Sequence, residues 1–310
     1  MEEKKYIMID PRREVSSFKG LIDTALFQEI LRKRIELEDI IGGSDLLFRV
    51  GRRQEKIIED NAIRHLTEIE PDIRGNVGRE KRLILQRSKE AWSHAKEGFK
   101  KTNGILTQDL IKEISNYLTG RYEFRKGVAY ITRSEGDIIT PAVVSPNSIE
   151  RELRFVINAI DNDQQNNQNP KKPYVSTLER AFLYHLHIAR VHPFDDGNGR
   201  VARICQNAAL YYVGLPAATV LTEERRTYIN LIQSALVGFS ERREELEDKI
   251  IPKLTQIRDK EHLRIEYATD IYLNTSQAEK TFYEFLAKKV SIELQKLLNS
   301  VMKVRKSKVY

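Results

Sequence analysis

The sequence predicts a mainly α-helical fold that carries one small β-hairpin, and three observations support this prediction. Charged residues make up 31% of the 310-residue chain, with only 15 glycines and 9 prolines, a composition that favours helices over turns. Apolar residues recur at helical spacing through most of the chain. At one place, GVAYITRSEGDIIT (127–140), β-branched and aromatic residues stand on both sides of a turn sequence, which is the pattern of a hairpin.

The part of the chain before the hairpin is expected to form helices. Helical spacing runs through residues 21–70 with interruptions at Gly42-Gly43 and Gly51, and a further break falls at EPDIRGNVG (70–78). The spacing resumes over residues 79–101, where the expected core contacts are Leu83, Leu85, Trp92 and Phe99.

Helix-end signals define the elements on either side of the hairpin. TQDLIKEISNYLTG (107–120) begins with Thr107 as a cap and ends at Gly120. After the hairpin, a capping box of Ser176 and Glu179 opens another helix. The remaining predicted elements are, in order, a helix over 147–160, a polar loop over 161–173, helices over 176–192 and 200–214, and helical sequence from about 240 onward.

Composition and charge count against several classes of protein. The chain has no run of about 18 apolar residues, so no membrane span is expected. The formal net charge is +7, but basic residues alternate with acidic ones except in MKVRKSKVY (302–310), so nucleic-acid binding is not expected. Cys205 is the only cysteine and no apolar signal segment opens the chain. Together these features predict a cytoplasmic protein without disulfides.

The most informative stretch is HPFDDGNGRVAR (192–203), which connects two predicted helices. Gly197 and Gly199 allow a tight turn that a ligand can approach closely. The start of the next helix offers unpaired N–H groups and a partial positive charge. Arg200 and Arg203 are three residues apart and can face the same side of that helix. These features predict a cradle for a polyphosphate.

Two carboxylates beside an anion site require a cation. Asp195 and Asp196 lie next to the predicted cradle, and a magnesium ion bound through one carboxylate and the substrate's phosphates would balance the charge. Asp196, directly before Gly197, is the preferred ligand. His192 opens the loop and, with an ordinary pKa of about 6.5, can accept a proton near neutral pH. The loop therefore predicts a base, a metal ligand and a phosphate cradle.

Plainer interpretations remain open for each part taken alone. His192 could be a structural histidine, DDG and GNG are common turn sequences, and the two arginines could lie on a solvated helix face. A transition-metal phosphohydrolase is another alternative, with the ligands His185, His187, His192 and Asp195. That set is disfavoured because His185 and His187, two residues apart on a helix, point in different directions.

The whole stretch resembles the Fic motif, HxFx(D/E)GNGRxxR, at every specified position. Members of the Fic family are mainly helical and typically transfer AMP from ATP to a hydroxyl side chain of a target protein. The resemblance implies a general base at His192, a core anchor at Phe194 and a magnesium ligand at Asp196. It also implies phosphate contacts from Gly197, Asn198, Gly199, Arg200 and Arg203.

Other parts of the chain agree with this resemblance, which is clear over about 105–240. Residues 127–141 lie where the family has its flap, which pairs with an extended segment of the target. RRTYINLIQSAL (225–236) resembles the helix that lines the nucleotide base pocket, with Tyr228 and Leu231 as the expected contacts. The chain thus divides into an N-terminal helical region, a Fic catalytic core and a C-terminal helical extension with a basic tail, over 1–104, 105–240 and 241–310.

Many members also carry an inhibitory helix with the pattern (S/T)xxxE(G/N), whose glutamate pairs with the second arginine of the main motif. SHAKEG (93–98) fits these letters with Glu97, but it precedes the helix at 107–120 directly. EKIIEDNAI (55–63) departs from the letters, yet it lies at the expected distance upstream. Position therefore favours Glu59, on a helix near 55–65, over Glu97.

The predicted function is that of an autoinhibited protein adenylyltransferase that uses ATP and magnesium to modify a Ser, Thr or Tyr hydroxyl. Two alternatives stay open. The same site could remove AMP or transfer another nucleotidyl group, or the chain could be a non-catalytic regulator that binds nucleotide or nucleic acid. A homodimer is expected only by analogy with the family.

Overall fold

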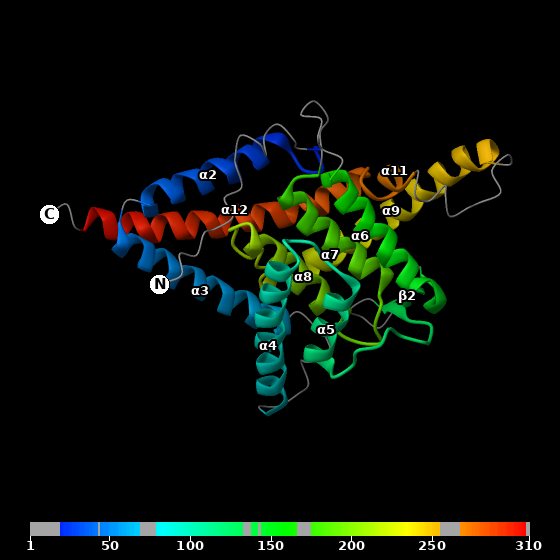
Figure 1. The fold of residues 1–310 in the computed structure, drawn as a ribbon, viewed down its shortest axis with the longest axis horizontal. Coiled ribbons are helices and arrows are strands. Elements are labelled where there is room, and N and C mark those ends of the chain that lie inside the picture. The colour runs from blue at the N-terminus through cyan, green and yellow to red at the C-terminus, as the bar shows by residue number, and fades with distance from the viewer. Residues whose placement is uncertain are drawn as a thin grey trace.

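The computed structural model describes residues 19–42, 44–68, 79–132, 138–141, 144–165, 175–254 and 267–307. This part of the chain is mainly helical (Figure 1), which confirms the predicted class. None of its helices is apolar over a stretch long enough to span a bilayer. The helices are α2 (Thr24–Gly42), α3 (Asp45–Glu68), α4 (Arg79–Lys101), α5 (Gln108–Thr119), α6 (Ile149–Gln165), α7 (Thr177–Val191), α8 (Asn198–Tyr212), α9 (Arg225–Leu254), α11 (Ala268–Tyr272) and α12 (Gln277–Lys306).

Local signals predicted several helix ends correctly. The Thr107 side chain accepts a hydrogen bond from the backbone N–H of Leu110, and Gly120 ends α5 in the left-handed region with φ 76°. Ser176 and Glu179 form the reciprocal capping box that opens α7. The helix predicted over 79–101 is α4, whereas the break predicted at 70–78 lies outside the described residues.

Two expectations about helix interiors are wrong. Gly51 does not interrupt a helix but lies inside α3. A Cβ atom at this position would come within 2.9 Å of Cδ1 of Ile41, so the glycine allows a close contact between α3 and the end of α2. Leu83 is 45% exposed on α4, whereas Trp92 and Phe99 are buried as expected.

Helix α7 is the centre of the molecule. It packs against α6, α8, α9 and α12, and nearly all of its side chains are buried. Several of these side chains are polar, and a buried polar group needs a hydrogen-bond partner inside the fold. The buried polar residues of α7 are Glu179, Arg180, His185, His187 and Arg190.

The C-terminal helix α12 connects elements from both ends of the chain. It packs against α2, α3 and α9 and lies between α2 and α3 in Figure 1. The Nζ atom of Lys33 on α2 donates a hydrogen bond to Oγ of Ser291 on α12 at 2.8 Å. Buried hydrophobic side chains from both ends of the chain, from Leu21 to Val301, also belong to one continuous cluster.

Two short strands lie between α5 and α6. Strand β1 (Tyr130–Thr132) pairs antiparallel with β2 (Ile138–Pro141), with Tyr130 opposite Pro141 and Thr132 opposite Ile138. Residues 133–137 between the strands lie outside the described residues. The role of this segment as a flap stays a prediction.

Candidate functional site

The predicted site loop lies between α7 and α8, and two residues with positive φ define its ends. His192 ends α7 in the left-handed region with φ 49°, and Pro193 after it cannot continue the helical hydrogen bonding. Gly197 adopts φ 80° directly before α8. A Cβ atom on Gly197 would lie 2.9 Å from Cγ2 of Thr119, so both conformation and space favour glycine here.

Asn198 and Phe194 fix the shape of the loop between these ends. The Asn198 side chain accepts a hydrogen bond from Phe194 N at 2.9 Å and donates one to Phe194 O at 2.7 Å. The Phe194 ring is buried and lies 5.5 Å from the ring of Phe124, centroid to centroid. The Asn198 amide therefore shapes the loop backbone, and Phe194 is anchored in the core as expected.

The two acidic residues of the loop face solvent and have different partners. The Asp196 side chain is 61% exposed; one of its oxygens accepts from Gly197 N at 2.6 Å, and the other lies 3.0 Å from NH2 of Arg200. Asp195 forms an exposed ion pair with Arg121 at 2.8 Å. Asp196 is thus the carboxylate that lies beside the start of α8.

His192 is half-buried at the other end of the loop. Its Nδ1 atom lies 3.4 Å from the carbonyl oxygen of Ala189. Because a carbonyl oxygen is only an acceptor, this contact favours a proton on Nδ1, which in the neutral ring leaves the lone pair on Nε2. The imidazole is therefore oriented with Nε2 as its basic atom.

Arg200 and Arg203 do not form a solvated helix face, since they are only 6% and 5% exposed. The Nε atom of Arg200 is buried and has no hydrogen-bond partner among the described residues. Arg203 donates from NH2 to the carbonyl oxygen of Leu66 and from NH1 to the hydroxyl of Tyr228, each at 3.3 Å. The end of α3 thus reaches the second arginine of the motif.

A buried chain of hydrogen bonds extends from Arg203 into the core. The Tyr228 hydroxyl lies 2.8 Å from Nε2 of His185, and Nδ1 of His185 lies 2.5 Å from Oε1 of Gln206. Burial lowers the pKa of His185 to about 3, so the ring is neutral, with Nδ1–H donating to Gln206 and Nε2 accepting from Tyr228. Gln206 then donates to Asn207 at 3.0 Å. This network reaches Arg203 through the Tyr228 hydroxyl and fixes the position of its guanidinium group.

The alternative transition-metal site is not assembled. His185 is occupied by Gln206 and Tyr228, while His187 contacts Arg190 and the carbonyl oxygen of Tyr272. Within the ranges that the structure describes, no three His, Cys, Asp or Glu side chains are arranged to hold a metal ion.

The two residues expected in the base pocket differ in their surroundings. Tyr228 is buried, and its hydroxyl lies between His185 and Arg203. Leu231 is partly buried and packs against the core. The Tyr228 hydroxyl thus contacts the second arginine of the motif, and the role of Tyr228 and Leu231 in a base pocket stays a prediction.

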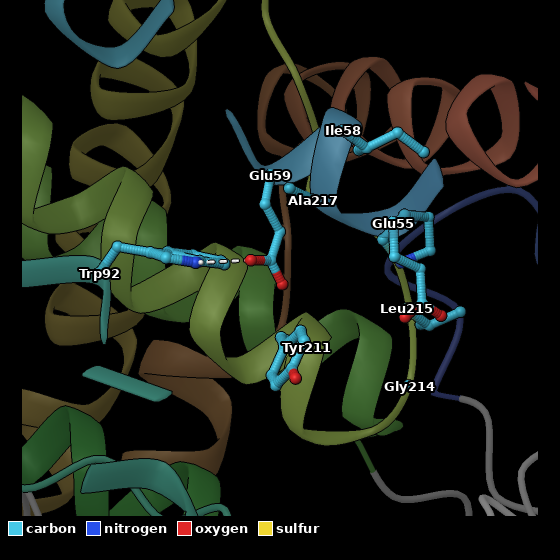
Figure 2. A pocket seen from close by; sticks show the side chains of 9 residues that line it. Glu55, Ile58, Glu59, Trp92, Tyr211, Gly214, Leu215 and Ala217 are labelled. Atoms are coloured by element: carbon cyan, nitrogen blue, oxygen red, sulfur yellow. Dashed lines mark hydrogen bonds between the residues drawn. The ribbon is translucent and has the colours of Figure 1, made fainter. Parts of the chain in front are cut away.

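The expected contact between Glu59 and Arg203 is not formed. Glu59 accepts hydrogen bonds from Nζ of Lys96 at 3.0 Å and from the indole N–H of Trp92 at 3.4 Å. Figure 2 shows its carboxylate directed toward Trp92, in a small pocket that is also lined by Tyr211. The second candidate, Glu97, is exposed on α4, whereas Arg203 is buried.

Sequence reasoning missed three residues that support the site. Gln206 belongs to the network behind Arg203, and Leu66 binds this arginine through its backbone carbonyl. Arg125 donates from Nε to the carbonyl oxygen of His192 at 2.7 Å. None of the three belongs to the motif at 192–203, and a backbone contact such as that of Leu66 leaves no signal in the sequence.

Comparison with known proteins gives similarities for the region around this loop. Residues 105–210 match the model of the Fic/DOC family. The protein adenylyltransferase Fic of Nematostella vectensis is 32% identical over 102 residues, which cover 33% of this chain and 22% of that protein. A probable protein adenylyltransferase of Aquifex aeolicus is 25% identical over 154 residues, 49% of this chain and 43% of that protein. The chain thus spans less than half the length of these curated relatives.

Solved structures share the fold over a longer part of the chain. A Fic domain-containing signaling protein from Bacteroides thetaiotaomicron superposes with a TM-score of 0.64 at 15% identity, covering 89% of this chain and 97% of that one. Fic-1 of C. elegans gives a TM-score of 0.55 at 17% identity, covering 88% of this chain and 73% of that one. At these identities the likeness concerns the fold alone.

Proposed function

We propose that the chain transfers AMP from ATP to a serine, threonine or tyrosine hydroxyl of a target protein, because residues 105–210 match the model of the Fic/DOC family. The observation that carries this proposal is the arrangement of the loop at 192–203. It has His192 at one end, the exposed carboxylate of Asp196 in the middle and the buried guanidinium groups of Arg200 and Arg203 at the other end. This set suits a triphosphate substrate and a hydroxyl nucleophile.

In the proposed reaction, the hydroxyl oxygen of the target attacks the α-phosphorus of ATP. The bond between this phosphorus and the oxygen bridging to the β-phosphate breaks, and pyrophosphate leaves with the electron pair. Nε2 of His192 accepts the hydroxyl proton. Arg200 and Arg203 stabilise the negative charge on the phosphate oxygens. Catalysis then comes from positioning and charge stabilisation rather than from a covalent intermediate.

The residues around Asp196 fit a magnesium ion. Asp196 offers exposed, hard oxygen atoms beside the N-terminus of α8. A single protein carboxylate is enough, because Mg²⁺ commonly takes its other ligands from substrate phosphates and water. When bound, the ion would neutralise part of the phosphate charge.

The test is incubation with magnesium and ATP labelled on either the α- or the γ-phosphate. We expect label on protein from the α-phosphate only, and none with His192→Ala. His94→Ala is the matched control, because the partly exposed His94 on α4 pairs with Glu113 on α5, outside the loop at 192–203. Labelled UTP and a target that already carries AMP distinguish the two other reactions, transfer of another nucleotide and removal of AMP. Label transfer that survives His192→Ala would contradict the role of this histidine.

Restraint of the site by α3 is the second part of the proposal. The carbonyl oxygen of Leu66, near the end of α3, accepts a hydrogen bond from NH2 of Arg203, so the proposed triphosphate would share this guanidinium with α3. Glu59 contacts Lys96 and thereby joins α3 to α4. We propose that Glu59 restrains the enzyme through this contact rather than by binding Arg203.

Two variants distinguish these routes. Glu59→Gly should raise activity under either route. Lys96→Met removes the partner of Glu59 but leaves the glutamate, so it should also raise activity if Glu59 acts by holding α3 in place. Activity that falls in Lys96→Met and rises in Glu59→Gly would show that the released glutamate inhibits the site directly.

A further inference from the structure

The segment before β1 runs along the catalytic loop and contacts it at successive residues. The backbone N–H of Arg125 donates to the carbonyl oxygen of Pro193 at 2.8 Å. The other contacts in this stretch are the ring pair Phe124–Phe194 and the ion pair Arg121–Asp195. Backbone, apolar and charged contacts therefore all align these two segments, which are distant in sequence.

The Arg125 side chain extends this contact to both ends of the strand pair. Its Nε donates to the carbonyl oxygen of His192 at 2.7 Å, its NH1 to that of Gly127 at 2.8 Å and its NH2 to that of Val144. Gly127 precedes β1, and Val144 follows β2. One guanidinium group thus binds three segments, and it is only 4% exposed.

Arginine is suited to this position for a geometric reason. Its planar guanidinium group presents five N–H donors in a fixed fork, whereas lysine offers a single ammonium group at the end of a flexible chain. Each carbonyl oxygen would be left without this donor if the side chain were removed, and buried polar groups that lose their partner are costly. Burial lowers the pKa of Arg125, but an arginine stays charged at any physiological pH.

We propose that Arg125 is a positioning residue that couples the β1–β2 strand pair to the catalytic histidine. It holds the backbone of His192 at a set distance from both ends of the strand pair, where the target segment is expected to dock. The coupling aligns the target hydroxyl with Nε2 of His192. This inference rests on the proposed transfer reaction and adds a residue outside the 192–203 motif to it.

The coupling can be separated from a general contribution to the fold. The phosphate contacts assigned to Arg200 and Arg203 lie on α8, whereas the Arg125 side chain donates hydrogen bonds to the start of the loop and to both ends of the strand pair. Loss of the Arg125 side chain should therefore impair transfer to the target and spare ATP binding. Loss of a residue that only supports folding would impair transfer and ATP binding alike.

The experiment compares Arg125→Met and Arg125→Lys with Lys126→Met as the matched control. Lys126 is the neighbouring residue and is exposed, so its variant removes the same charge without removing the three contacts. ATP affinity is measured by calorimetry with magnesium, and transfer by label from the α-phosphate. Amide hydrogen exchange is followed separately for peptides covering 126–144, 192–199 and α8.

In Arg125→Met, the rate of transfer should fall on the order of 10- to 100-fold, the size expected for a misplaced catalytic group. The ATP dissociation constant should stay within about threefold of the parent value, since the arginines on α8 remain. Hydrogen exchange should become faster in 126–144 and in 192–199 together, and stay unchanged in α8. Arg125→Lys should not restore transfer, and Lys126→Met should match the parent protein.

Three outcomes would overturn the inference. These are equal losses of ATP affinity and transfer in Arg125→Met, full activity in Arg125→Lys, or faster exchange confined to 126–144. If Arg125→Met does not fold, the transfer rate and the hydrogen exchange of Arg125→Lys are compared with those of the parent protein. Full activity, or faster exchange confined to 126–144, would again overturn the inference. If the parent protein transfers no label, the proposed function fails, whereas the exchange measurement still tests the coupling of the two segments.

Discussion

Replacing His185 with asparagine should make the fold less sensitive to acid. His185 is completely buried on α7, and this burial lowers the pKa of the ring to about 3 in the folded protein. Its hydrogen bond to Gln206 acts in the opposite direction, and the positive charge of Arg203 lowers the pKa further. The unfolded chain, by contrast, should titrate this residue near the ordinary value of about 6.5.

The sign of the effect follows from proton binding in the two states. Above pH 6.5, His185 is neutral in both states and contributes no pH dependence. Below pH 6.5, the unfolded chain binds a proton that the folded protein does not bind, so the free energy of unfolding falls by about 1.4 kcal/mol per pH unit until about pH 3. Between pH 7.5 and pH 5.0 the loss from His185 alone is about 2 kcal/mol.

Urea unfolding at these two pH values measures the effect. His187 is also buried, and its pKa is lowered by burial, so the parent protein should lose stability from both histidines. The asparagine variant should lose about 2 kcal/mol less than the parent over the same interval. Its absolute stability is not the readout, because the substitution also changes the contacts with Gln206 and Tyr228. Equal losses in the two proteins, within about 0.5 kcal/mol, would refute a neutral, buried His185.

Two further predictions concern the loop and the core. Gly197→Ala should lower the free energy of unfolding by about 1–2 kcal/mol through the left-handed conformation alone, and further through the 2.9 Å contact with Cγ2 of Thr119. Thr119→Ser removes that methyl group, so in urea unfolding the double variant should recover only the stability lost to the contact. Strictly additive losses from the two substitutions would disprove the clash. Burial raises the pKa of Asp161 to about 6. The unfolded chain therefore loses this proton at a lower pH than the folded protein does, and the free energy of unfolding falls as the pH rises from about 4 to about 6. Asp161→Asn should therefore gain stability over the parent at pH 7.5 but not at pH 4, and a gain that is the same at both values would contradict this reasoning.

The parts of the site that could be predicted from the sequence are those whose chemistry is local. Gly197 and its neighbours form a turn into a helix because of their own backbone preferences. Capping by Thr107 and by Ser176 with Glu179 likewise depends on residues within one helical turn. These short-range rules predicted the ends of α5 and α7 and the loop that precedes α8.

The parts that could not be predicted depend on contacts between distant segments. Arg125 binds a carbonyl 67 residues away and Arg203 one that is 137 residues away, and a backbone carbonyl has no identity in the sequence. Gly51 was misjudged for a related reason. In the structure, the absence of a side chain at Gly51 leaves space for Ile41 of the neighbouring helix. In the sequence, the same glycine looks like a helix break.

The interactions of the loop also differ in strength, and this difference indicates which of them should change when substrate binds. The two hydrogen bonds between Asn198 and Phe194 are buried, and leaving such groups unpaired costs roughly 1–3 kcal/mol each. The pair between Asp196 and Arg200 is an i,i+4 contact with a largely exposed carboxylate, and pairs of this kind contribute only about 0.3–0.5 kcal/mol. In the proposed reaction, a triphosphate would therefore draw Arg200 away from Asp196 at little cost, and the carboxylate would be released for a cation. The backbone set by Asn198 should stay in place meanwhile, so the loop can exchange its charge partners without changing its shape.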